Sequence, residues 1–140
     1  MKTNTPKLVL FVCVGNSCRS QMAEGFGNHY GQGKVVAFSA GTMPAGKVHP
    51  LAIEAMREVG IDISHQTSKG VWEFDLTQFD AVVSVCHAAT DELCPATYMG
   101  LQERWDIPDP VGQAMDEFRR VRTMIEARVR DLVQQLIGDA

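Results

Sequence analysis

The stretch of sequence that decides the fold is KLVLFVCVGNSCRSQMAEGF, residues 7–26 of a 140-residue chain. After Lys7 every residue up to position 13 is apolar, as expected for a strand that is buried on both faces of a parallel sheet. A helix is expected from Cys18 to about His29, followed by a glycine-rich stop at 31–33. The stretch therefore predicts a strand, a short loop and a helix in direct succession.

The rest of the chain predicts three more strands and two more helices. In chain order we expect a strand at 35–39, a helix from Pro50 that ends at Gly60, a turn of helix near 71–74, a strand at 81–86, a short strand within 101–107 and a helix at 113–137. The helix that begins at Pro50 is expected to bury Leu51, Ala55, Met56 and Val59. This order is typical of an α/β fold in which an open parallel four-stranded sheet carries helices on both faces, and the length fits a single domain, residues 1–140.

Composition and charge argue against two classes of partner. The net charge is -4, so no basic surface is predicted for a nucleic-acid backbone. The longest apolar run, residues 8–14, has seven residues, which is too short to cross a membrane, and no cleavage site follows it. We therefore expect a cytoplasmic protein, and a monomer because no surplus apolar face is evident.

The loop between the first strand and the first helix has the composition of an oxyanion site. A loop that runs into a helix N-terminus directs several backbone N–H groups and the positive end of the helix dipole at one point. Gly15 and Asn16 tolerate the positive φ angles of such a curl, and the guanidinium of Arg19 can pair with two oxygens of one anion. The predicted oxyanion ligands are Val14, Gly15, Asn16, Ser17, Cys18 and Arg19.

Cys13 is the predicted nucleophile, because a helix N-terminus and a nearby arginine favour the thiolate form of a cysteine at neutral pH. Ser20 could hold this thiolate through its hydroxyl group, or simply begin the helix. Cys18 could form a disulfide with Cys13, but its place at the start of the helix favours a side chain that points into the core.

Two further cysteines suggest more than a single nucleophile. Sites in open parallel sheets lie at the carboxyl ends of the strands, so Cys86 is expected close to Cys13. A phosphatase needs one cysteine, and Cys86 together with Cys94 therefore indicates a redox relay. The alternative for Cys86 is a small buried core residue. The chain contains no Cys-x2-Cys pair, which argues against a zinc site.

Asp109 is the predicted general acid, since it follows the last expected strand and precedes Pro110 in a rigid turn. Its rivals for this role are Asp106 and Glu103. A purely structural role, as the cap of the last helix, is the alternative interpretation of Asp109.

The residues from Cys13 to Gly25, CVGNSCRSQMAEG, closely resemble the signature of arsenate reductases built on the low-molecular-weight tyrosine phosphatase fold. The resemblance covers nearly the whole chain, through Ser39-Ala40-Gly41, His49-Pro50, residues 60–64, Thr67-Ser68, Cys86, Asp109-Pro110 and residues 118–122.

This resemblance implies a relay of three cysteines. Cys13 attacks the arsenic of arsenate with Asp109 as general acid, and Cys86 then attacks Cys13, which releases arsenite and leaves a Cys13–Cys86 disulfide. Cys94 attacks Cys86 next and carries the disulfide outward on a mobile segment within 87–100, where thioredoxin reduces it. The resemblance implies no bound cofactor or metal, and phosphate and sulfate as competing anions.

Two details separate the chain from patterns in that family. Seven residues stand between Cys86 and Cys94, one more than in the thioredoxin-linked members, so reduction by glutathione and glutaredoxin is the alternative. No tyrosine follows Asp109-Pro110, whereas tyrosines at that place hold the aromatic substrate of the related tyrosine phosphatases. Phosphatase activity is therefore the runner-up, with weak hydrolysis of aryl phosphates still expected. A non-catalytic oxyanion sensor is less consistent with an acid such as Asp109 beside the anion.

A third departure concerns potassium. In family members that bind the ion, residues matching Asn16, Glu24 and Ser39 hold it, and an aspartate stands at the position of Lys69. We expect the Lys69 ammonium group to replace the ion, so that potassium does not stimulate activity. Asn16, Ser20 and Glu24 then serve as support for the loop.

Overall fold

The computed structural model describes residues 5–86 and 98–138. Its sheet has the strand order β2-β1-β3-β4, and every neighbouring pair of strands is parallel. The strands are β1 (Lys7–Cys13), β2 (Val35–Gly41), β3 (Ala81–Ser84) and β4 (Leu101–Arg104). The α-helices are α1 (Arg19–Gly31), α2 (Pro50–Arg57) and α3 (Met115–Ile137), and two short 3-10 helices are η1 (Val71–Glu73) and η2 (Leu76–Gln78). The predicted open parallel sheet of four strands is confirmed.

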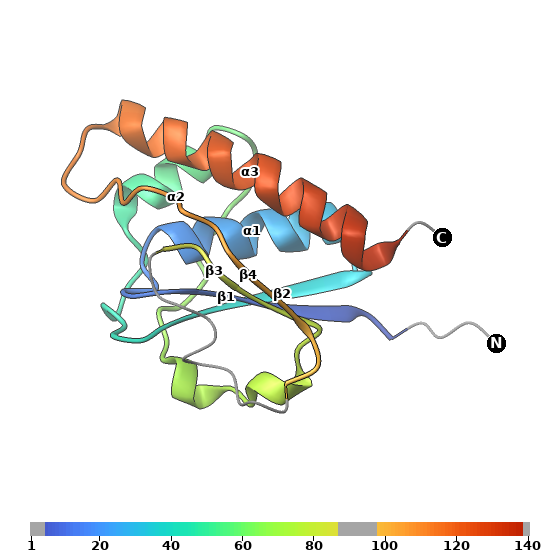
Figure 1. The fold of residues 1–140 in the computed structure, drawn as a ribbon. Coiled ribbons are helices and arrows are strands. Elements are labelled where there is room, and N and C mark those ends of the chain that lie inside the picture. The colour runs from blue at the N-terminus through green and yellow to red at the C-terminus, as the bar shows by residue number, and fades with distance from the viewer. Residues whose placement is uncertain (1–4, 87–97, 139–140) are drawn as a thin grey trace.

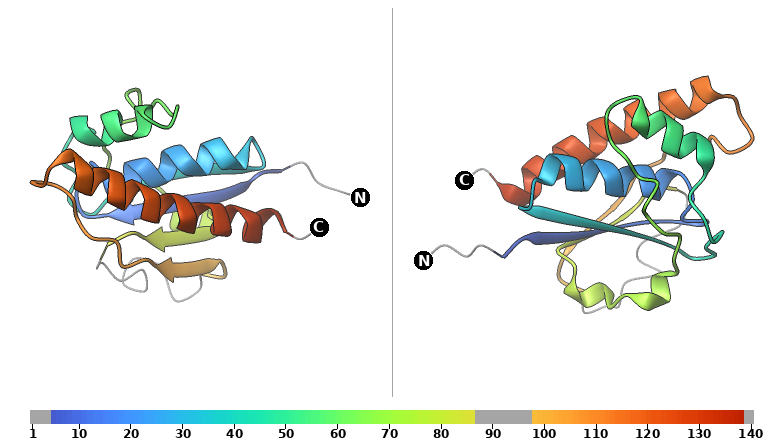
Figure 2. Two further views of the ribbon diagram at one scale, coloured as in Figure 1. Left: turned by 90° about the horizontal axis from the view of Figure 1, so that it is seen from above. Right: turned by 180° about the vertical axis from the view of Figure 1, so that it is seen from behind.

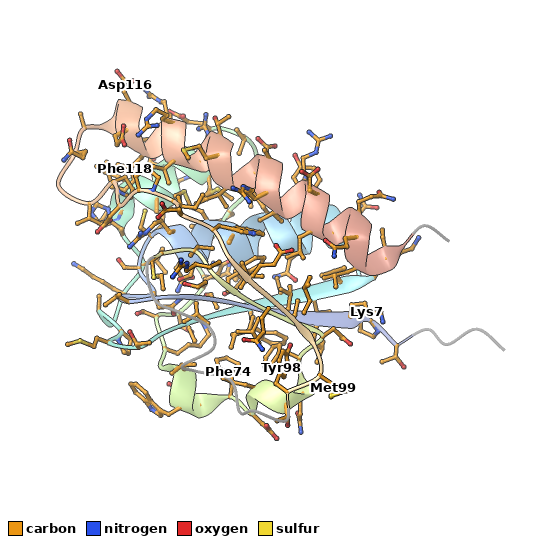
Figure 3. All side chains as sticks on the ribbon, in the orientation of Figure 1. Lys7, Phe74, Tyr98, Met99, Asp116 and Phe118 are labelled. Carbon is orange, nitrogen blue, oxygen red and sulfur yellow. The ribbon has the colours of Figure 1, made fainter. Side chains whose placement is uncertain are left out.

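Both faces of the sheet are covered within the described residues. The three α-helices lie together over one face, and the 3-10 helices lie below the other (Figure 1). The view from above and the view from behind in Figure 2 show the same layers. In Figure 3 Phe118 lies on the α-helical side, whereas Phe74 and Tyr98 lie on the opposite side. The helices on the second face are thus short 3-10 turns.

Alternation along the strands divides the core into two clusters, because successive side chains of a strand point to opposite faces. In β1, Val9, Phe11 and Cys13 join the cluster under the α-helices, whereas Leu10 and Val12 join the cluster above η1 and η2. All five are buried. The unbroken apolar run that predicted a strand covered on both faces is therefore explained by the packing.

Two expected boundaries differ in the structure. The strand that was expected to end at Cys86 ends at Ser84, and helix α2 ends at Arg57, before Gly60. After Arg57 the chain tightens, since the N–H of Val59 bonds to the carbonyl of Met56, three residues back. The prediction that Val59 is buried on the helical face is wrong, because this turn leaves it 40% exposed.

Helix α3 confirms the expected amphipathic pattern. Its buried residues are Phe118, Val121, Ile125, Val129, Leu132 and Val133. No helix among residues 5–86 and 98–138 is both long enough and apolar enough to cross a membrane.

Candidate active site

Cys13 lies at the carboxyl end of β1 and is 3% exposed, while the helix that follows begins six residues later at Arg19. Its Sγ accepts the backbone N–H of Asn16 at 3.2 Å and lies 2.9 Å from the hydroxyl oxygen of Ser20. That oxygen also accepts a hydrogen bond from the Asn16 side-chain amide at 2.8 Å. The Ser20 proton is then best directed at Cys13, so the arrangement favours a thiolate that accepts two hydrogen bonds.

Asn16 has a φ angle of +46°, the left-handed conformation that the sequence predicted for this curl. Its side chain stabilises the conformation from two sides, because its amide nitrogen donates to Ser20 and its Oδ1 accepts the backbone N–H of Lys69 at 2.8 Å. The expected supporting roles of Asn16 and Ser20 have these contacts as their structural basis.

The outer side of the loop is bonded to the segment that follows β2. The carbonyl oxygens of Val14, Gly15 and Ser17 accept the backbone N–H groups of Met43, Ala45 and His49, each at 2.8 Å. A carbonyl group and the N–H of the same trans peptide point in opposite directions. The N–H groups of the loop are therefore turned toward the inside of the curl, where an anion would sit at the start of α1.

Arg19 extends from the first turn of α1 toward the loop that carries the predicted general acid. Its guanidinium donates to the backbone carbonyl of Ile107 at 2.9 Å and lies 3.9 Å from a carboxylate oxygen of Asp109. The structure thus brings Arg19 and Asp109 together at the edge of the loop. The Arg19 side chain is 11% exposed and that of Asp109 is 56% exposed, so the carboxyl group is open to solvent and to substrate.

The rivals of Asp109 have other surroundings. The Glu103 carboxylate accepts the indole N–H of Trp105 at 2.8 Å. Asp109 itself accepts the backbone N–H of Val111 at 3.0 Å, which is the rigid turn expected of Asp109-Pro110. The alternative interpretation of Asp109 as the cap of the last helix is wrong, because Ala114 occupies the N-cap of α3.

The structure places Cys86 just beyond β3, beside the strand that carries Cys13. Val12 pairs with Ser84, and the N–H of Val85 still bonds to the Val12 carbonyl at 2.9 Å. Cys86 is 2% exposed and belongs to the same apolar cluster as Cys13. Neighbouring strands lie about 4.8 Å apart, so the two thiols share one corner of the sheet.

The other two cysteines have different outcomes. Cys18 is 4% exposed and points into the core cluster, as expected for a structural side chain. Burial is the main cause that raises the pKa of its thiol well above the usual range, with the nearby Cys13 adding to it, so Cys18 is protonated at neutral pH. Cys94, the third member of the predicted relay, lies outside the described residues.

A buried ion pair lies beneath the loop. The ammonium group of Lys69 donates to the carbonyl of Thr67 at 2.5 Å and lies 3.9 Å from a carboxylate oxygen of Glu24, which also accepts the Ser39 hydroxyl at 2.5 Å. Burial raises the pKa of Glu24, while the hydrogen bond from Ser39 and the charge of Lys69 act in the opposite direction. A cation of the protein itself thus lies beside the carboxylate.

One contact of the loop was missed by the sequence reasoning. The side-chain amide of Gln21, on the first turn of α1, donates to the carbonyl of Asn16 at 3.0 Å and to the carbonyl of Thr67 at 2.9 Å. Gln21 is fully buried. Its only signal in the sequence is a polar residue beside Met22 at a position that a helix start would bury.

A cleft of about 550 Å³ lies at the opposite end of the sheet, between residues that include Lys7, Asp80 and Gln135. Figure 3 shows Lys7, Tyr98 and Met99 at this end. The cleft contains none of the reactive residues described above. Among the described residues no group of three or more His, Cys, Asp or Glu side chains is arranged to hold a metal ion.

Comparison with known proteins identifies the family. The family model described as low molecular weight phosphotyrosine protein phosphatase matches residues 8–140. The chain is 42% identical over 130 residues to the glutaredoxin arsenate reductase of Synechocystis, and 44% identical over 131 residues to arsenate reductase 1 of Staphylococcus epidermidis. Each alignment covers 93% of this chain and 98% of the relative.

A solved structure described as an arsenate reductase in the phosphate binding state superposes with a TM-score of 0.85 at 43% identity, and covers 93% of this chain and 98% of the other. The parallel sheet and the strand-loop-helix site agree with this likeness. The chain belongs to the low molecular weight phosphotyrosine protein phosphatase family.

Proposed function

We propose that this protein reduces arsenate to arsenite through a relay of Cys13, Cys86 and Cys94, and that thioredoxin regenerates it. The observation that carries the proposal is the buried position of Cys86 in the same corner of the sheet as the nucleophile Cys13. A phosphatase of this family type uses the loop and the acid but has no role for a second thiol there. The names of relatives more than 40% identical to this chain support the same activity.

The first step forms a bond between sulfur and arsenic. The Cys13 thiolate attacks the arsenic of arsenate while the loop N–H groups and Arg19 hold its oxygens. Asp109 donates a proton to the oxygen that leaves, which departs as water. Asp109 suits this role because its carboxyl group is exposed beside Arg19 at the edge of the loop.

The second step is the reduction itself. Cys86 attacks the sulfur of Cys13, the sulfur–arsenic bond breaks, and its electron pair stays on arsenic, which leaves as arsenite. Arsenic gains two electrons and the two thiols lose two, so one Cys13–Cys86 disulfide forms for each arsenite. Cys94 then attacks Cys86, which frees Cys13 as a thiolate and leaves a Cys86–Cys94 disulfide.

Burial explains why a third thiol is useful. Cys13 and Cys86 are 3% and 2% exposed, so a protein reductant cannot reach a disulfide between them without rearrangement. Transfer to Cys94 moves the disulfide to a different segment of the chain. A dithiol of thioredoxin can then reduce it, in the reducing cytoplasm where we place the protein as a monomer.

Glutaredoxin with glutathione is the second candidate for the reductant. Two observations favour it: the spacing of seven residues between Cys86 and Cys94, and the name of the Synechocystis relative, glutaredoxin arsenate reductase. Weak hydrolysis of aryl phosphates is also expected, because the loop cannot fully distinguish two similar tetrahedral anions. Phosphate and sulfate should act as competitive inhibitors for the same reason.

The test is arsenate-dependent consumption of NADPH with thioredoxin and thioredoxin reductase, beside a parallel assay with glutathione, glutaredoxin and glutathione reductase. Cys13→Ser, Cys86→Ser and Cys94→Ser should each abolish turnover, whereas Cys18→Ser serves as a matched control for the loss of a buried thiol. Full turnover of Cys94→Ser would remove that residue from the relay. Turnover with glutaredoxin alone would change the partner.

A further inference from the structure

The loop around Cys13 can bind an anion only if its peptide groups keep their orientation. The carbonyl groups of Val14, Gly15 and Ser17 are fixed outward by backbone N–H groups from residues 43–49. The unit that begins with the Gly15 carbonyl shows the consequence, because its N–H, that of Asn16, points to Cys13 Sγ at 3.2 Å. Outward carbonyls therefore set inward N–H groups.

One peptide unit of the loop is held differently. Within the described residues, the recorded partner of the Asn16 carbonyl is a side chain, the amide nitrogen of Gln21 at 3.0 Å. The same peptide unit carries the N–H of Ser17, so rotation of this unit would replace an inward donor with an inward carbonyl oxygen. Asn16 already has an unusual φ of +46°, so local backbone preference does not secure the unit.

The amide of Gln21 is itself held in one orientation. Its Oε1 accepts a hydrogen bond from the side chain of Gln66 at 2.8 Å, and its nitrogen also donates to the carbonyl of Thr67 at 2.9 Å. With its oxygen engaged by a donor, the nitrogen faces the Asn16 carbonyl. Gln21 is fully buried, so water does not compete for these bonds.

We propose that Gln21 is a positioning residue for anion binding, and that it fixes the peptide between Asn16 and Ser17 so that the Ser17 N–H faces the oxyanion. The inference rests on the oxyanion-binding step of the proposed function and is independent of the thiol relay and of the reductant. It assigns an anion-binding role to a side chain that does not touch the anion.

Calorimetric titration of the reduced protein with inorganic phosphate tests the proposal. Gln21→Met keeps the length and buried character of the side chain but removes the donor. It should weaken phosphate binding roughly 10- to 100-fold, as expected for one lost hydrogen bond to a charged group. The thiolate absorbance of Cys13 at 240 nm, measured against Cys13→Ser, should not change, because the contacts of Cys13 with Asn16 and Ser20 are kept.

Ser68→Ala is the matched control. Ser68 donates to the neighbouring Gly15 carbonyl at 3.2 Å, but this carbonyl keeps the backbone N–H of Ala45 at 2.8 Å. Its phosphate affinity should stay within about threefold of the wild type, less than one full hydrogen bond. An equal loss in Ser68→Ala and Gln21→Met would overturn the proposal, since general loosening of the loop would then explain both.

Gln66→Leu provides a second variant should Gln21→Met not fold. Gln66 is half-buried, and its loss leaves Gln21 in place with an amide that is free to turn over. Binding should weaken about 3- to 10-fold, less than for Gln21→Met. If the wild type binds phosphate and the variants bind it equally well, the inference fails alone. If the wild type binds no phosphate, the oxyanion step of the proposed function fails with it.

Discussion

Replacement of Lys69 tests whether the protein carries its own cation beneath the active-site loop. The ammonium group lies 3.9 Å from the Glu24 carboxylate, and the two side chains are 19% and 14% exposed. At this distance the Coulomb attraction is about 4 kcal/mol for an effective dielectric constant of about 20. Removal of one partner of a largely buried pair costs about 3 kcal/mol, and the remaining solvent contact of both groups reduces this to about 2 kcal/mol.

Lys69→Met should therefore lower the free energy of unfolding by about 2 kcal/mol, which corresponds to about 6 °C in Tm for a chain of this size. The loss should largely vanish in the background of Glu24→Gln, because the carboxylate no longer needs a counter-charge. Urea unfolding of the four proteins gives the coupling energy. A coupling near zero would show that Lys69 and Glu24 do not interact.

Potassium distinguishes an internal cation from a simple ion pair. The activity and Tm of the wild type should be the same in potassium chloride and in choline chloride at equal ionic strength. Lys69→Ala leaves space beside Glu24, so 100 mM potassium should raise its stability by about 1.4 kcal/mol if the ion binds with a Kd near 10 mM. Potassium stimulation of wild-type activity by severalfold would refute the reasoning.

Three further predictions concern the loop and the helices. Ser20→Ala removes a donor to the Cys13 thiolate, so absorbance at 240 nm at pH 7 should fall and kcat should drop roughly 10- to 100-fold; unchanged values would exclude the hydroxyl from this role. Gly41→Ala places a Cβ 2.5 Å from the Val14 carbonyl oxygen, and thermal unfolding should show a loss of about 1–3 kcal/mol with weaker phosphate binding. Hydrogen bonds from two arginines of α3 lower the pKa of Glu58 from 4.5 to about 2, so this carboxylate stabilises the fold above about pH 4.5 and the contribution is lost as the pH falls toward 2. Glu58→Gln should accordingly lower the Tm at pH 7, and the difference from the wild type should disappear near pH 2.

The sequence was sufficient for the parts of the site that depend on local pattern. The apolar run that ends at Cys13 gave the bounds of β1, and Gly15-Asn16 before a helix indicated the curl with its positive φ. The contact of Ser20 with Cys13 follows from this local geometry. Strand order places Cys86 near Cys13, because both residues follow adjacent parallel strands.

Contacts between distant segments left no such pattern. Arg19 is held by the backbone carbonyl of Ile107, an acceptor that every residue type offers. Gln21 bonds to a carbonyl of the loop and to Thr67, and nothing in its own position specifies either partner. The end of α2 was misplaced because Gly60 closes a tighter turn after the helix and does not terminate the helix itself.

The most direct test of the proposed function is a single turnover without any external reductant. Fully reduced protein mixed with excess arsenate should release one arsenite per chain and lose two titratable thiols, since the two electrons come from the protein's own cysteines. Cys86→Ser should release none while it still hydrolyses an aryl phosphate slowly. Release of no arsenite by the wild type, with its thiols unchanged and its phosphatase activity intact, would contradict the account.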